Sequence, residues 1–188
     1  MARSYFRSAS LCGTCHEVRT PHLVEETLTE YRASDRAGED SCATCHFDGH
    51  RFVGATAAMM ARALRLDVTP EGVRLTNVGA AHAVPTGQLG LREVWVDVTV
   101  TDAQGAVFEF PRALDLTADL GGADVFTEAP GLMPHGLAAG ETRVFSVSGG
   151  ARRITARLFF RRVRASTARA LGLEAARAEL VDERASPQ

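Results

Sequence analysis

The sequence predicts an α+β protein with a short helical and loop segment over residues 1–63, a small antiparallel β-sandwich over residues 64–165, and a C-terminal helix and tail over residues 166–188. Two observations lead to this prediction. Apolar and polar side chains alternate from Leu64 onward, and turns rich in Gly and Pro separate the alternating stretches. A period of two is typical of half-buried strands, and several such strands separated by turns favour a sandwich.

The segment before Leu64 carries two copies of a Cys-x-x-Cys-His motif, Cys12–His16 and Cys42–His46. This spacing marks the covalent attachment of haem c. Residues i, i+3 and i+4 share one face of a helical turn, so both thiols can reach one porphyrin while the imidazole lies beneath the iron. We therefore predict two covalently bound haem c groups. The attachment residues are Cys12, Cys15, Cys42 and Cys45, and the proximal iron ligands are His16 and His46.

Cysteine pairs have other uses, which must be weighed against haem attachment. They can clamp a zinc ion, act as redox dithiols or form a disulfide framework. None of these uses requires a histidine directly after the second cysteine, and here one follows in both motifs. All four cysteines of the chain belong to the two motifs. The sequence therefore favours haem attachment.

Two short helices are expected near the motifs. Leu23, Val24, Leu28 and Tyr31 recur at roughly helical spacing, and Ala55–Ala63 has high helix propensity. A segment of this size needs little ordinary core, because two porphyrins would supply much of the apolar mass.

Six alternating stretches downstream predict strands. The clearest one runs from Val94 to Val100, and Asp102–Gly105 after it is typical of a hairpin turn. We expect Trp95, Phe159 and Phe160 to pack within the sheets. The strands are expected over residues 64–69, 73–77, 94–100, 107–110, 144–147 and 154–160.

The C-terminal region predicts one more helix. Ser166 is a suitable N-cap for a helix that extends to about Ala178. The tail from Glu179 is ambiguous between a strand and a frayed end.

Each haem iron has a second axial position, for which other histidines are candidates. His50 lies four residues after its neighbouring motif, on the same side of that haem, so it could reach only the first haem. By the same reasoning His22 could cap only the second haem. His82 lies in a rigid loop, Gly79–Gly87, that could fold back over a haem. Spacing alone leaves open whether His22 or His82 caps the second haem.

The remaining candidates for the axial positions are weaker. His135 follows Pro134 and precedes a glycine, so we expect a turn residue. Met59, Met60 and Met133 could serve as thioether ligands. The Met59–Met60 pair is nevertheless more typical of a helix that packs on a core.

The stretch from Phe6 to Gly87 resembles a recurring pattern in bacterial multihaem c-type cytochromes, loosely the cytochrome c-554-like group. That pattern combines a Leu-Cys-Gly-x-Cys-His opening, a second Cys-x-x-Cys-His, a His-x-Phe-x-Gly element and a Gly-x-Gly-His-x-x-Pro-Thr-Gly loop. The chain departs from it at Ala81, where relatives carry Gly, and in having only two haem motifs. The resemblance implies that His50 and His82 are distal iron ligands. The matching elements are Leu11–His16, Ser41–His46, His50–Gly54 and Gly79–Gly87.

Composition narrows the choice of partners and location. The net charge is −2, so no strong field of one sign favours nucleic acid or an anionic membrane. No apolar run is long enough to span a bilayer. The N-terminus lacks the apolar region of a secretory signal. Because the resemblance implies export before haem attachment, we expect a periplasmic or extracellular protein whose signal has been removed.

Bis-histidine ligation leaves no open iron position, which suits electron transfer rather than bond-making chemistry. We therefore expect an electron-transfer dihaem cytochrome that serves redox partner proteins or identical subunits. A rival hypothesis is a peroxidase-like or nitrite-reductase-like enzyme with one open iron and an acid–base group such as Glu17, Glu25 or Asp48. The two motifs are also compatible with a haem sensor and with a subunit of an extended extracellular cytochrome complex or filament.

Overall fold

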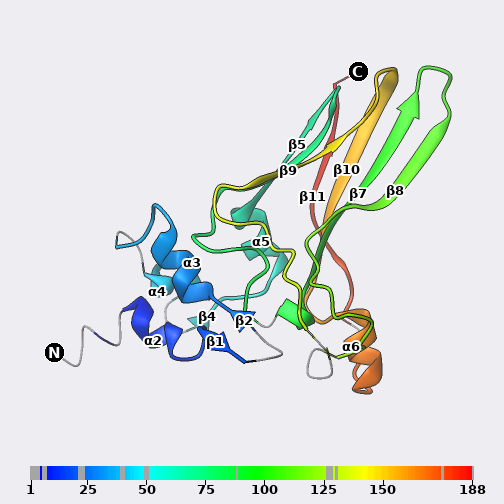
Figure 1. Cartoon of the computed structure of the whole chain (residues 1–188). Coiled ribbons are helices and arrows are strands. Elements are labelled where there is room, and N and C mark those ends of the chain that lie inside the picture. Colours follow the sequence, from blue (N-terminus) through cyan, green and yellow to red (C-terminus); the bar gives the residue numbers. More distant parts are fainter. Residues whose placement is uncertain are drawn as a thin grey trace.

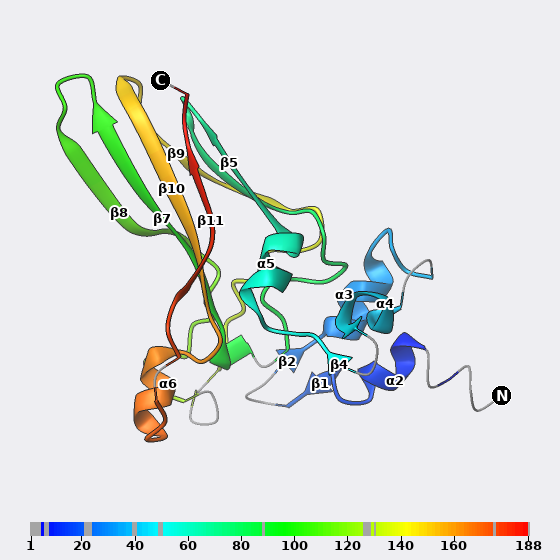
Figure 2. The ribbon, with the colours of Figure 1, turned by 180° about the vertical axis from the view of Figure 1, so that it is seen from behind.

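The computed structural model describes residues 5, 8–20, 24–38, 41–48, 51–87, 89–125, 129, 131–174 and 176–187. Short helices and strands gather at one end of the molecule, and long strands run away from them (Figures 1 and 2). The elements at the first end are α2 (Ala9–Gly13), β1 (Val18–Arg19), β2 (Val24–Glu25), α3 (Thr27–Ala33), α4 (Cys42–His46), β3 (Phe47–Asp48) and β4 (Arg51–Phe52). Within the described residues, no helix is long and apolar enough to cross a membrane.

The short elements of the N-terminal segment pack closely on one another. A Cβ atom at Gly13 would lie 2.2 Å from a methyl carbon of Leu28 in α3, so a larger residue at position 13 would force that side chain to shift. Strand β1 pairs with β2, and β3 pairs with β4. The helix expected from residue 23 begins only at Thr27, because Val24 and Glu25 form the β-pairs with β1.

The rest of the chain forms two antiparallel sheets. One has the strand order β11-β10-β7-β8 and the other β5-β6-β9. The α+β fold class predicted from the alternating pattern is confirmed. The strands are β5 (Leu64–Thr69), β6 (Gly72–Asn77), β7 (Glu93–Asp102), β8 (Val107–Asp115), β9 (Thr142–Ser146), β10 (Ala151–Arg161) and β11 (Glu179–Ala185). Helix α5 (Ala57–Ala63) precedes β5, a short 3-10 helix (Leu89–Leu91) precedes β7, and α6 (Ala165–Ala170) follows β10.

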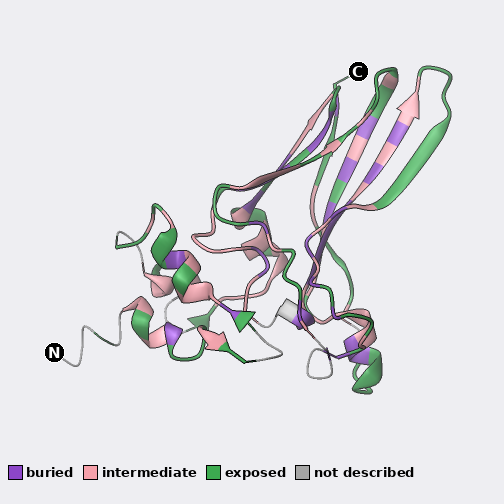
Figure 3. Ribbon diagram, in the orientation of Figure 1, coloured by how far each residue is buried: buried purple, intermediate pink, exposed green. Residues whose placement is uncertain are grey.

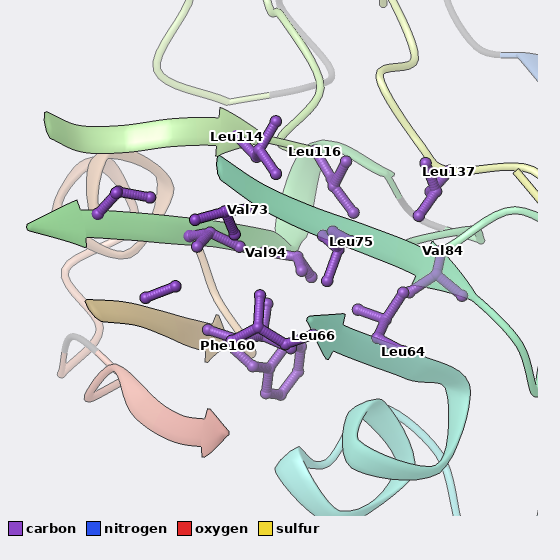
Figure 4. Close-up of a cluster of buried hydrophobic side chains, with 14 of the residues drawn as sticks. Leu64, Leu66, Val73, Leu75, Val84, Val94, Leu114, Leu116, Leu137 and Phe160 are labelled. Atoms are coloured by element: carbon purple, nitrogen blue, oxygen red, sulfur yellow. The ribbon is translucent and has the colours of Figure 1, made fainter. Parts of the chain in front are cut away.

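One hydrophobic core joins the two sheets. Leu75 from the smaller sheet and Val96, Leu158 and Phe160 from the larger one are fully buried in the same cluster (Figure 4). Val96 stands directly opposite Leu158, so their side chains share a face of the sheet. The alternating bands of buried and less buried residues along β7 and β10 follow the period of two that predicted these strands (Figure 3).

The opposite face of the larger sheet has its own aromatic layer. Trp95 stacks on Phe159 with ring centroids 5.4 Å apart, and the guanidinium of Arg112 lies 4.3 Å from the Trp95 ring centroid. Glu93 is buried beside them and forms ion pairs with Arg112 and Arg161 at 2.5 and 2.6 Å. Both Trp95 and Phe160 therefore pack within the sheets as expected, but on opposite faces.

The C-terminal helix is shorter than the sequence pattern predicts. Helix α6 ends at Ala170, and Gly172 adopts a positive φ of 62° just beyond it. A left-handed glycine is a common helix stop. The expected helix to Ala178 is therefore wrong, and the ambiguous tail resolves into β11, which pairs with β10.

Candidate haem site

Both Cys-x-x-Cys-His motifs lie on helical turns, as the attachment geometry requires. In the first motif, the carbonyl oxygen of Cys12 accepts hydrogen bonds from the N–H groups of Cys15 and His16 at 3.1 and 3.0 Å. The second motif forms the whole of α4, which begins with a capping box between Ser41 and Thr44. Each motif therefore places its two thiols and its imidazole on one helical face.

The two motifs lie next to each other. Helix α2 contacts α4. Burial raises the pKa of the Cys42 thiol, and the neighbouring Cys12 thiol, with which it hydrogen-bonds, raises the pKa further. Two haems attached at these motifs would be bound through thiols that lie next to each other.

The described residues include all four cysteines. Each thiol is free rather than in a disulfide. In the described part of the chain, no three His, Cys, Asp or Glu side chains converge to hold a metal ion in the manner of a zinc clamp.

The Nδ1 atom of each motif histidine forms a hydrogen bond with an oxygen acceptor. His16 Nδ1 lies 2.7 Å from Oε1 of Glu25, a residue that is only 5% exposed. His46 Nδ1 lies 3.0 Å from the carbonyl oxygen of Val53. An Nδ1–H group that donates to such acceptors fixes the neutral tautomer and leaves Nε2 as the metal-binding nitrogen. Both imidazoles are therefore oriented as iron ligands would need to be.

His82 faces His46 from a different part of the chain. Their rings are nearly parallel, at 14°, and their centroids lie 6.0 Å apart. Imidazole nitrogens bind metal ions at about 2 Å, so two imidazoles on opposite sides of one metal have ring centres about 6 Å apart. His82 Nδ1 also lies 2.9 Å from a carbonyl oxygen, that of Ala83. The two rings are stacked in the structure, and their separation equals that of two imidazoles that share one metal.

Burial adds to this fit. It lowers the pKa of His82, and the nearby His46 and His16 lower it further. The neutral form of histidine, which is the form that binds a metal, is therefore favoured. An open cavity of about 600 Å³ borders His82 and is also lined by Arg36 and Asn77. Among the described residues that line it there is neither a motif cysteine nor a motif histidine.

The loop that carries His82 runs between α3 and the sheets. From the α3 side, Glu30 accepts a hydrogen bond from the N–H of Ala83 at 3.0 Å, and the hydroxyls of Thr27 and Thr86 lie 2.7 Å apart. Arg36 donates to the carbonyl oxygen of Gly79 at 2.9 Å. The loop is thus fixed at several points along its length.

The other ligand candidates have different outcomes. His22 and His50 lie outside the described residues, in the stretches between β1 and β2 and between β3 and β4. His135 is exposed, and its carbonyl oxygen accepts a hydrogen bond from Arg143. Met60 packs against the hydrophobic core, as its spacing predicted, and Met133 is 61% exposed.

Several residues at the site were not assigned these roles from the sequence. Glu25 was considered only as one of three acid–base groups, whereas it is the acceptor for His16. Glu17 instead accepts hydrogen bonds from the N–H and hydroxyl of Thr29 at the start of α3. The side chain of Asp48 lies outside the described residues. Asn77 donates a hydrogen bond to the carbonyl oxygen of His82, and no sequence motif could have predicted this contact.

A solved cytochrome structure has a fold similar to that of this chain. The structure is similar to the crystal structure of a penta-haem cytochrome c552 from Thermochromatium tepidum, with a TM-score of 0.70 and 21% sequence identity. The two share a fold. The match covers 98% of this chain and 57% of the cytochrome, so this chain spans a little over half of the neighbour's length. No family model and no curated protein matches the chain.

Proposed function

We propose that the chain is a dihaem c-type cytochrome that transfers single electrons, with a histidine on both sides of each iron. The observation that supports this most strongly is the parallel pair of His46 and His82 rings, 6.0 Å apart. Haem groups supply irons that take up and release one electron. The fold shared with a penta-haem cytochrome is consistent with this proposal.

The residues around the irons have distinct roles in this proposal. His46 and His82 hold the second iron from opposite sides, and His16 holds the first. With His82 on the second haem, His50 supplies the remaining position on the first haem, and His22 is the alternative to His82 on the second haem. Because the axial positions are filled by protein nitrogens, peroxide, nitrite or oxygen would find no vacant site.

The packing of the N-terminal segment supports the presence of large apolar groups. Among the described residues before Leu64, only Gly13, Glu25 and Tyr31 are buried. Phe47 and Phe52 are 49% and 62% exposed, although Phe52 stacks near His46 with ring centroids 5.3 Å apart. Exposed aromatic rings beside a ligand are what a segment completed by porphyrins would present.

The adjacency of Cys12 and Cys42 suggests electron exchange between the two haems within one chain. Partners are then other redox proteins or identical subunits, met without strong electrostatic steering because the net charge is only −2. A periplasmic or extracellular location, and membership of a larger cytochrome complex or filament, are part of the same proposal and rest on the resemblance of the sequence motifs.

Replacement of His82 by alanine tests the ligand assignment. The H82A holoprotein should retain two haems per chain by pyridine haemochrome assay, because all four thiols are intact. One iron should become high-spin in its electronic and EPR spectra, because it loses an axial nitrogen. The matched control is H135A, which removes an exposed histidine and should leave both irons low-spin.

A low-spin spectrum at both haems of H82A would contradict the assignment and favour His22 as the ligand of the second haem. Fewer than two haems per chain in the unmodified protein would contradict the dihaem proposal itself.

A further inference from the structure

We propose that Asn77, a residue of the β-sheet, is a positioning residue that holds His82 against its iron. This inference rests on the proposed role of His82 as an axial ligand. It adds a specific function to the sheets, which is to keep the axial position closed. The evidence is a set of hydrogen bonds made by one buried side chain.

Asn77 ends β6 and is 1% exposed. Its Nδ2 atom donates to the carbonyl oxygens of His82 at 2.9 Å and Leu137 at 3.0 Å, and its Oδ1 atom accepts from the N–H of Ala80 at 3.0 Å. One side chain therefore joins the backbone of the ligand, the backbone two residues before it, and a neighbouring chain segment.

Asn77 and Leu137 are themselves held in place by further backbone hydrogen bonds. The backbone N–H of Asn77 donates to Glu141 at 3.0 Å, and its carbonyl oxygen accepts from Gly140 at 3.0 Å. Leu137 and Val84 exchange both of their backbone hydrogen bonds, at 3.0 and 2.9 Å. Asn77 thereby transmits the rigidity of the sheet to a loop that has little regular structure of its own.

The chemistry of this position is specific to asparagine. A buried polar side chain costs free energy unless it is hydrogen-bonded, so an apolar residue would be the simpler choice for a strand end in a core. The amide uniquely offers two donors and an acceptor at the required length. Aspartate would keep the acceptor for Ala80 but would oppose the carbonyl oxygens of His82 and Leu137.

The consequence for function concerns how often the axial position opens. His82 leaves an iron more easily when its loop can move, and two of the three side-chain hydrogen bonds of Asn77, to His82 and Ala80, oppose that motion. Loss of one buried hydrogen bond of this kind generally shifts an equilibrium by about fivefold or more, and two such bonds hold the loop. We therefore expect that weakening them raises the population in which His82 is detached by at least about tenfold.

The experiment compares Asn77→Ala with Thr76→Val in the holoprotein. Thr76 is a matched control because it is also a buried polar residue of β6, 9% exposed, but its hydroxyl bonds to Thr142 at 2.9 Å and not to the loop. For N77A we expect a high-spin fraction at one haem and carbon monoxide binding to the reduced protein at least about tenfold faster. Added imidazole should restore the low-spin spectrum. T76V should lower the melting temperature without any of these changes.

Low-spin spectra and carbon monoxide rates in N77A that match those of T76V would overturn the proposal and leave Asn77 a purely structural residue. If N77A does not accumulate as holoprotein, Asn77→Asp keeps the side-chain volume and the bond to Ala80. N77D should then show faster carbon monoxide binding, and a wild-type rate would overturn the proposal. Failure of the ligand assignment is distinguishable, because H82A would then remain low-spin.

Discussion

The two motif histidines differ in the group that accepts their Nδ1–H. His16 donates to a buried carboxylate, Glu25, whereas His46 donates to the carbonyl oxygen of Val53. A carboxylate partner makes an imidazole a stronger electron donor to its metal than a carbonyl does. The two haems should therefore have different reduction potentials even where both have two histidine ligands.

Glu25→Gln tests this difference. Glutamine keeps an oxygen acceptor for His16 but removes the negative charge that stabilises the oxidised iron. The potential of one haem should rise by on the order of 60 mV, a tenfold change in a one-electron equilibrium, while the other stays unchanged. Potentiometric titration followed by optical spectroscopy measures both.

The control for this titration is Glu26→Gln. Glu26 neighbours Glu25 in sequence but pairs with Arg19 rather than with a motif histidine. An equal shift in both variants would mean that general charge near the site, and not the bond to His16, sets the potential.

Glu30 provides a pH-dependent prediction. Burial raises the pKa of Glu30 above its ordinary value of 4.5. The folded protein therefore retains a proton over a pH range in which the unfolded chain has lost it, so this group lowers the free energy of unfolding as pH rises through that range. The melting temperature of E30Q minus that of the wild type should increase between about pH 4 and pH 7.

The matched variant E17Q should behave in the opposite sense. Hydrogen bonds from Thr29 lower the pKa of Glu17, so its contribution to stability is present above the ordinary glutamate pKa and lost as pH falls through the lowered value. If the melting temperatures of E30Q and E17Q follow the same pH trend relative to wild type, at least one of the two carboxyl groups does not have the environment described.

At the scale of single residues, the sequence predicts chemistry better than it predicts contacts. The motif spacing alone predicts His16 and His46 as proximal ligands, because that chemistry depends on neighbours in the chain. The pairing of His46 with His82 and the acceptor role of Glu25 depend on contacts between distant segments. Only the folded chain brings those segments together.

At the scale of the elements, the strands of both sheets contribute side chains to one core. The outer face of the larger sheet carries a separate aromatic cluster around Trp95. Phe160 is fully buried between the sheets, and the adjacent Phe159 points to the other face and stacks on Trp95. Adjacent residues of one strand therefore make very different contributions to stability.

Phe160→Ala should lower the free energy of unfolding by about 3–5 kcal/mol, because it removes a large side chain from a closed core. Phe159→Ala should cost less than half as much. Urea unfolding followed by circular dichroism measures both, and the low-spin spectra should persist in each variant at low urea. Equal costs would contradict the assignment of the two rings to opposite faces.

Periodicity predicted the strands well because a half-buried strand imposes alternation on its own residues. The pattern failed where pairing partners decided the outcome. Val24 and Glu25 have helical neighbours but pair with β1, and the chain after Gly172 leaves the helix and joins β10 as β11. Such pairings depend on an available strand edge, which no local pattern reveals.

At the scale of the whole molecule, the N-terminal segment and the sheets differ in packing and in proposed role. The sheets have a continuous apolar core, whereas the N-terminal segment has few buried residues and two attachment motifs (Figure 3). The Gly79–Gly87 loop links the two ends, since it is bonded to α3 on one side and to Asn77 on the other. The α+β class was predictable from composition and periodicity, but this linkage was not, because it needs the relative placement of both ends.

Carbon monoxide binding to the reduced holoprotein tests most directly whether both irons are closed by histidines, as an electron carrier requires. Carbon monoxide needs a vacant or easily vacated axial position on ferrous iron. We predict that the Soret band of the reduced protein shows no rapid shift when carbon monoxide is added. A rapid shift at either haem would contradict the electron-carrier proposal and indicate an open iron site of the kind that a haem enzyme uses.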